Sequence, residues 1–110
     1  MKAITIITAK IQDTIYQSIL SGEKTYEVRT HDFENAQVIR YVSARDGKEL
    51  GLWTLEDFFT INSSNRKALE KYTSVSTSIV DELFPYSSVR YPIYVAKLGH
   101  ETTLNNIFKE

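Results

Sequence analysis

The sequence predicts an α+β domain in which about five mostly antiparallel strands curl into a small β-barrel with helices packed at its ends. Segments with β-branched residues recur along the chain, an amphipathic helix follows the first of them, and an Asp-Gly turn joins two of them as a hairpin. The expected strands are residues 1–8, 25–30, 37–44, 49–61 and 91–98. The expected helices are residues 10–21, 66–72 and 79–84.

Composition limits the class of protein. The chain has 110 residues, 42% of them hydrophobic, which supports a single domain over residues 1–110. We expect its core in residues 1–98 and a polar tail in residues 99–110. There is no cysteine and there are only two histidines, His31 and His100, so disulfides and thiolate metal sites are excluded. We therefore expect neither a metal nor a cofactor.

The charge balance and the first residues bear on partners and location. Thirteen basic and fourteen acidic residues leave a net charge of -1, which excludes a general nucleic-acid coat protein. Nucleic-acid binding would have to come from a local basic patch. Residues 1–8 form only a broken apolar run, too short for a secretory signal or a membrane span. We expect a cytoplasmic protein that does not contact membranes, and the oligomeric state stays open.

The first helix is expected over residues 10–21. Ile11, Ile15 and Ile19 recur every four residues, which is the spacing of one apolar face of a helix. Gly22 follows at the position where a glycine ends many helices. The next element therefore begins just after Gly22.

A charged strand follows this helix. Alternation over residues 25–30 predicts a half-buried strand, with Glu27 and Arg29 together on the face opposite Tyr26. Lys24 lies in the turn that leads into the strand and need not follow the alternation. Three charged groups are thus expected close together.

The middle of the chain predicts a hairpin. Residues 37–44 and 49–61 flank a turn with Asp46-Gly47 at its centre, and a bend is expected at Glu56-Asp57. Ser63 or Ser64 is then expected to cap the helix over residues 66–72.

The last third of the chain predicts a helix, a strand and a tail. Pro85 ends the helix over residues 79–84, and Gly99 ends the strand over residues 91–98. In the tail, the apolar residues could dock one further helical turn on the domain. These residues are Leu104, Ile107 and Phe108.

Gly22, Lys24, Glu27 and Arg29 match the Gly-x-Lys-x-x-Glu-x-Arg signature of the ASCH domains, and the chain resembles a single-domain member of that family over roughly residues 1–98. The resemblance implies a PUA-like β-barrel whose cleft, between the first helix and the barrel, is lined by the signature. It also implies action on RNA, as a binding module in coactivator and translation-related settings.

The resemblance also implies possible chemistry. One bacterial branch of the family hydrolyses the amide of N(4)-acetylcytidine, and other members are reported as ribonucleases. The amidohydrolase branch carries threonine where this chain has Glu27, together with a glutamate from a later helix. At the corresponding stretch, residues 75–77, this chain has Val, Ser and Thr. The difference favours binding over amide hydrolysis.

Each signature residue has a functional and a structural interpretation. Lys24 could act as a general base or nucleophile, anchor a phosphate, or simply be solvated. Glu27 could orient Arg29 through a bidentate pair, act as a base, or form an ordinary ion pair. Arg29 suits phosphate, because its planar donors match phosphate geometry, and the alternative is structural pairing with Glu27 or Asp32.

Other residues extend the candidate site. Tyr26 and Tyr91 could stack on bases, with core or rim packing as the alternative. His31 could act as an acid or base beside the signature, or be solvated. Tyr41 is expected to be a packing residue.

The leading prediction is an RNA- or nucleotide-binding module in which Lys24, Arg29, Tyr26 and Tyr91 contact the nucleic acid. The first alternative is a hydrolase of modified nucleosides, or a ribonuclease, with Lys24 and Glu27 as catalytic residues. The second alternative is a protein-interaction domain that uses the apolar tail.

Overall fold

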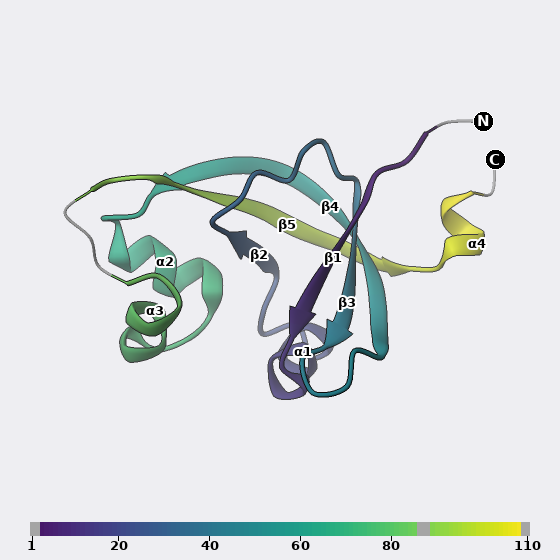
Figure 1. Cartoon of the computed structure of the whole chain (residues 1–110), viewed down its shortest axis with the longest axis horizontal. Helices are drawn as coiled ribbons and strands as arrows, with labels where there is room; N and C mark the ends of the chain where they lie inside the picture. Colours follow the sequence, from purple (N-terminus) through teal and green to yellow (C-terminus); the bar gives the residue numbers. More distant parts are fainter. Residues whose placement is uncertain (1–2, 86–88, 109–110) are drawn as a thin grey trace.

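A computed structural model of the chain describes residues 3–85 and 89–108, in which five strands and four helices follow one another (Figure 1). In chain order they are β1 (Ile6–Ile11), α1 (Asp13–Leu20), β2 (Tyr26–Arg29), β3 (Val38–Ser43), β4 (Glu49–Asn62), α2 (Arg66–Thr73), α3 (Thr77–Leu83), β5 (Pro92–Thr102) and α4 (Leu104–Ile107).

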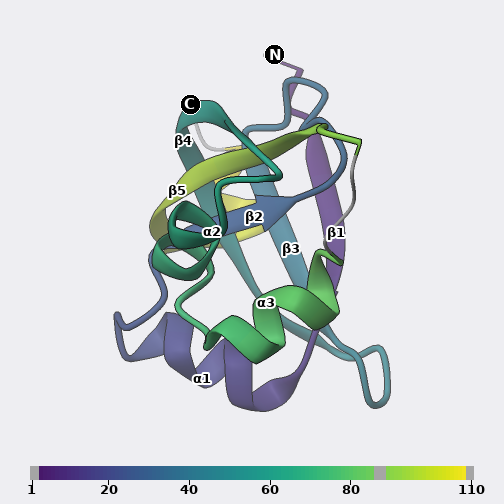
Figure 2. The same ribbon diagram turned by 90° about the vertical axis from the view of Figure 1, so that its left-hand side faces the viewer.

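The strands form one curled sheet in the order β1-β3-β4-β5-β2. Strands β1 and β3 are parallel, and the other neighbours are antiparallel. The α+β fold with a barrel-like sheet is confirmed. Its curl is that of a half-barrel, because β1 and β2 are the two edges of the sheet and the described ladder does not join them. Figure 2 shows the curl from the end where α1, α2 and α3 gather.

The first helix starts later than the apolar spacing predicts. Lys10 and Ile11 belong to β1, where Ile11 pairs with Ser43 of β3, and α1 begins at Asp13. Strand pairing therefore overrides the helical spacing of Ile11 with Ile15. The predicted strand over residues 1–8 corresponds to β1, which runs three residues further, and residues 1 and 2 lie outside the described residues.

The hairpin and the bend are confirmed. Gly47 has φ +75°, and the Ser43 N–H donates to the carbonyl of Lys48, which closes the turn between β3 and β4. In β4 the register shifts between Glu56 and Phe59, with Asp57 in the left-handed region at φ +53°. A β-bulge thus forms where the bend was predicted.

Two boundary predictions are wrong. The side chain that caps α2 is Asn65, which accepts the N–H of Ala68, whereas Ser63 is buried and accepts the N–H of Tyr91. Strand β5 runs past Gly99 to Thr102. A methyl group at Gly99 would overlap the Thr54 hydroxyl, so this glycine permits a close approach of β4 and β5 and does not end the strand.

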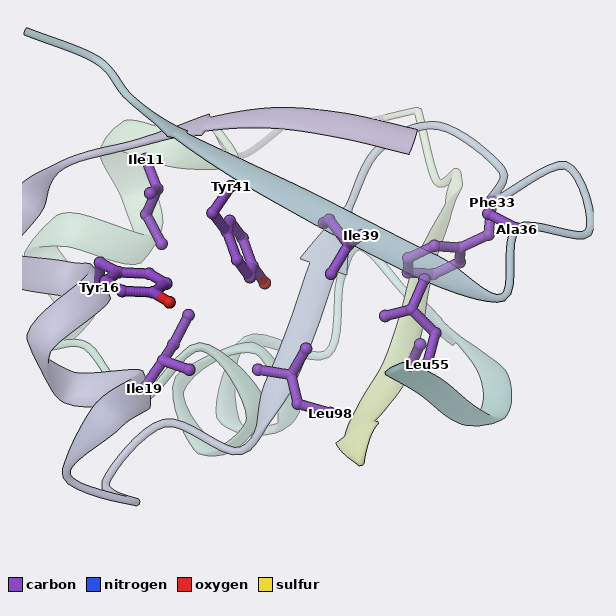
Figure 3. Packing of buried hydrophobic residues seen from close by; sticks show 10 residues of the cluster. Ile11, Tyr16, Ile19, Phe33, Ala36, Ile39, Tyr41, Leu55 and Leu98 are labelled. Atoms are coloured by element: carbon purple, nitrogen blue, oxygen red, sulfur yellow. The ribbon is translucent and has the colours of Figure 1, made fainter. Parts of the chain in front are cut away.

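Two apolar clusters make up the core. The larger one fills the space between the curled sheet and α1, where Tyr16 and Tyr41 meet edge to face (Figure 3). The smaller one holds α2 and α3 against the far ends of β4 and β5, through Leu69, Val80 and Ile93. In Figure 1, α2 and α3 lie together on the side of β2 opposite to α4. Within residues 3–85 and 89–108, no helix has the length and apolar character needed to cross a bilayer.

Gly51→Ala is expected to destabilise the fold by about 1–3 kcal/mol, because a methyl group there would overlap the buried Tyr16 hydroxyl. Urea unfolding measures the cost. In a Tyr16→Phe background the overlapping oxygen is gone, so the same glycine change should cost less. Equal costs in the two backgrounds would show that this contact does not limit the position.

Candidate functional site

The end of α1 fixes the backbone of Lys24. The helix ends at Leu20, and Gly22 adopts φ +83°, as expected of a glycine that stops a helix. The backbone N–H of Lys24 then donates to the carbonyl of Ser18 at 3.0 Å. The lysine is tied to the helix end, and its side chain is 9% exposed.

Glu27 is buried at the edge of the sheet and bonded across its concave side. The Tyr41 hydroxyl on β3 donates to Glu27 Oε1 on β2 at 2.6 Å. These two strands are separated by β4 and β5 in the sheet order, so only the curl brings the two side chains together. Both residues are buried, at 1% exposure for Tyr41 and 9% for Glu27.

Arg29 does not form the predicted ion pair. Among the described residues, no salt bridge joins it to Glu27 or Asp32. Its guanidinium carbon lies 5.7 Å from the ring centre of Phe33, a cation–π arrangement. Its Nη1 is buried without a hydrogen-bond partner in the described chain. One strong donor is therefore left for a ligand.

These three charged residues line one cleft of about 370 Å³. The cleft lies at the seam between the two apolar clusters, since Ile11 of the larger cluster and Phe84 of the smaller one both border it. The remaining lining residues are Lys10, Ile15, Val28, Thr30, His31, Tyr41, Thr73, Val75 and Leu83. The volume falls within the range of small-molecule sites.

Burial perturbs the acid and the base in opposite directions. It lowers the pKa of Lys24, while the nearby Glu27 charge acts to raise it. Burial raises the pKa of Glu27. The hydrogen bond from Tyr41 and the charges of Lys24 and Arg29 act in the opposite direction and lower it. Burial and the Glu27 charge raise the pKa of Tyr41, so its hydroxyl stays protonated and donates. Perturbed groups of this kind gather at functional sites.

The other candidate residues fall in different places. His31 borders the cleft, exposed, with Nδ1 3.2 Å from the Thr30 hydroxyl oxygen. Tyr26 does not border the cleft, because its ring packs edge to face on Phe59 and Tyr72. Tyr91 packs on the smaller core cluster and lines a separate hollow. Neither tyrosine joins the signature residues.

Tyr41 is the site residue that the sequence assigned to packing alone. It does pack, but its hydroxyl also reaches Glu27, and Figure 3 shows its ring descending between Ile11 and Ile39. A buried tyrosine needs a partner for its hydroxyl, and a buried carboxylate needs a donor. The contact between Tyr41 and Glu27 could be predicted from this requirement only if both residues were already known to be buried.

The tail forms a short helix with exposed apolar side chains. In α4 and its cap, Leu104 and Phe108 are 48% and 50% exposed, while Ile107 is half-buried. A role for this tail in protein interaction stays a prediction. Across residues 3–85 and 89–108, no group of three or more histidine, aspartate or glutamate side chains gathers to hold a metal ion.

Comparison with known proteins identifies the fold. The structure is similar to the crystal structure of an ASCH protein from Zymomonas mobilis, with a TM-score of 0.68 and 16% identity over 93% of this chain and 76% of that chain. Two mutant forms of the same protein give TM-scores of 0.67, at 16% and 15% identity. No family model matches the sequence, and neither does any curated protein. The chain therefore has the fold of ASCH proteins.

Glu27→Gln is expected to make the free energy of unfolding less dependent on pH. Burial raises the pKa of Glu27 in the folded protein, so the protonated form is favoured by folding. Its contribution to stability is complete below the unfolded pKa, near 4.5, and is lost as the pH rises through the folded pKa. The variant does not titrate there. Wild type should therefore lose stability relative to the variant in urea unfolding as the pH rises above about 4.5 and through the raised folded pKa of Glu27.

The matched control is Glu82→Gln, which changes an exposed glutamate on α3 and should follow the wild-type curve. Parallel curves for wild type and Glu27→Gln would mean that Glu27 titrates in the folded protein as it does in the unfolded chain.

Proposed function

We propose that this chain is an RNA- or nucleotide-binding module whose cleft receives one nucleotide. The observation that carries the proposal is the buried Nη1 of Arg29, which has no hydrogen-bond partner in the described chain and belongs to a residue that lines the cleft together with Lys24. A buried donor without a partner costs free energy, and a phosphate or base oxygen would satisfy it.

Local charge supports an anionic ligand. The cleft is bordered by Lys10, Lys24 and Arg29, and Glu27 is the acid among its lining residues. These cations would supply the local basic patch that a chain of net charge -1 needs for binding nucleic acid. Because Tyr41 and the neighbouring cations compensate Glu27, the carboxylate need not repel a phosphate.

The walls of the cleft suit a base. Ile15, Val28 and Leu83 offer apolar surface on which a flat ring could lie. Glu27 accepts from Tyr41 through Oε1, and carboxylate oxygens also accept from the amino groups of bases. We assign base-edge recognition to Glu27 and phosphate contact to Arg29. Lys24 could contribute to either contact.

The test is fluorescence anisotropy with short single-stranded RNA at low salt. Arg29→Gln should weaken binding by about 1.5–3 kcal/mol, because it removes charged hydrogen bonds, and should lower the slope of log affinity against log salt by about 0.7 for one lost phosphate contact. Lys24→Met keeps the apolar stem and should also weaken binding.

Lys48→Met in the exposed hairpin turn is the control and should bind as wild type does, apart from a small general charge effect. Absence of RNA binding by wild type would sink the proposal. So would binding that is unchanged in both cleft variants.

A second candidate function is hydrolysis of a modified nucleoside or of RNA, with Lys24 and Glu27 as the acid–base pair. One observation favours it: burial lowers the pKa of the lysine and raises that of the glutamate, which moves both groups toward the range useful for proton transfer.

Incubation with N(4)-acetylcytidine and with labelled RNA, with and without divalent metal, tests this second function. We expect product from wild type and its loss in Glu27→Gln, with the urea unfolding transition of that variant intact. Product that persists in Glu27→Gln would remove Glu27 from the reaction. Binding without product would leave the binding function alone.

A further inference from the structure

A second hollow lies near the cleft, because the guanidinium of Arg29, which lines the cleft, lies over Phe33, which lines the second hollow. It has a volume of about 480 Å³ and is rich in aromatic side chains. We call it the aromatic groove, and its lining residues are Asp32, Phe33, Asn35, Ala36, Gln37, Phe58, Phe59, Thr60 and Tyr94. Nothing in the proposed function so far uses it.

The β-bulge in β4 builds this groove. In a regular strand, neighbours such as Phe58 and Phe59 point to opposite faces, so they would not border one hollow. The register shift between Glu56 and Phe59, with Asp57 at φ +53°, lets both rings do so. Phe58 is 49% exposed, so part of its ring is accessible to a ligand.

Phe58 is held in place although it is exposed. Its ring lies edge to face on buried Phe33, with 5.3 Å between the ring centres and 67° between the planes. One side of the ring is therefore fixed by the protein, and half of its surface faces solvent. A fixed, half-exposed aromatic ring is the kind of platform on which nucleic-acid bases stack.

Arg29 links the groove to the cleft. Cross-strand partners share a face of the sheet, and Arg29 pairs with Tyr94, which in turn pairs with Thr60. Arg29 borders the cleft, whereas Tyr94 and Thr60 border the groove. The guanidinium also lies over Phe33, a residue of the groove wall.

We infer that the aromatic groove binds a second base of a single-stranded RNA, next to the nucleotide held in the cleft, with the phosphate between them at Arg29. This inference rests on the proposed RNA-binding function and adds a subsite to it. The two hollows then hold neighbouring nucleotides, and the cation that serves both lies at their junction.

The charges of the groove agree with a base and disfavour a phosphate there. Its one charged lining residue is Asp32, whose Oδ1 accepts the Glu34 N–H at 3.1 Å. A carboxylate repels phosphate but can accept from a base amino group. Asn35, Gln37 and Thr60 add uncharged polar groups to the lining. The phosphate is thereby directed to Arg29, and the ring of the base to Phe58.

The experiment compares two phenylalanines of nearly equal exposure. Phe58→Ala removes the platform in the groove, and Phe108→Ala removes a ring that is 50% exposed in the tail and does not line the groove. Anisotropy with a short single-stranded RNA at low salt should give about 5- to 150-fold weaker binding for Phe58→Ala and no change for Phe108→Ala. Phe58→Trp should retain binding, because tryptophan also stacks.

A second readout uses the same RNA with 2-aminopurine, whose fluorescence falls on stacking. Quenching on binding should occur with wild type and Phe58→Trp and be reduced with Phe58→Ala. If Phe58→Ala binds as tightly as wild type while Arg29→Gln binds weakly, the groove subsite is overturned and the cleft stands. If both alanine variants weaken equally, the effect is not specific to the groove and the subsite is also overturned. If wild type binds no RNA, the proposed function fails, and the subsite fails with it.

Discussion

The hydrogen bond from Tyr41 to Glu27 is the contact around which the site is organised. It spans the concave side of the sheet, between β3 and the edge strand β2, at 2.6 Å. A buried carboxylate without such a donor would cost several kcal/mol in an apolar setting. The curl of the sheet, the burial of Glu27 and the position of Tyr41 in the core therefore depend on one another, and the cleft forms at the point where they meet.

The location of the cleft follows from the division of the core into two clusters. The larger cluster packs α1 onto the sheet, and the smaller one packs α2 and α3 onto the ends of β4 and β5. Strand β2 runs along the seam, with Val28 packed on the smaller cluster and Glu27 bonded to Tyr41 of the larger one. This short strand at the seam therefore places Glu27 and Arg29 on the lining of the cleft.

Local patterns predicted much of this fold, and long-range contacts account for the errors. The Gly22 stop, the Asp46-Gly47 turn and the bend at Asp57 depend on neighbouring residues, so the sequence predicts them. The spacing of the isoleucines predicts a helical Ile11, because spacing does not reveal its pairing with Ser43 of a distant strand. In the site, the charged residues could be predicted from their spacing. The role of Tyr41 and the groove at Phe58 could not, because they arise from the curl and from a bulge.

Lys24 and Glu27, two buried ionisable residues of the cleft, compensate each other's charge. Burial favours the neutral forms of Lys24 and Glu27, and their mutual attraction favours the charged forms. In both cases the pair is neutral in sum, so it adds no net attraction for an anion. In the proposed function, that attraction would come from Arg29, with Lys10 on the cleft wall. The pair is suited instead to uncharged polar groups, because it can present a donor and an acceptor and can exchange a proton between them. A nucleotide carries both kinds of group, a phosphate and a polar base edge, on one small ligand.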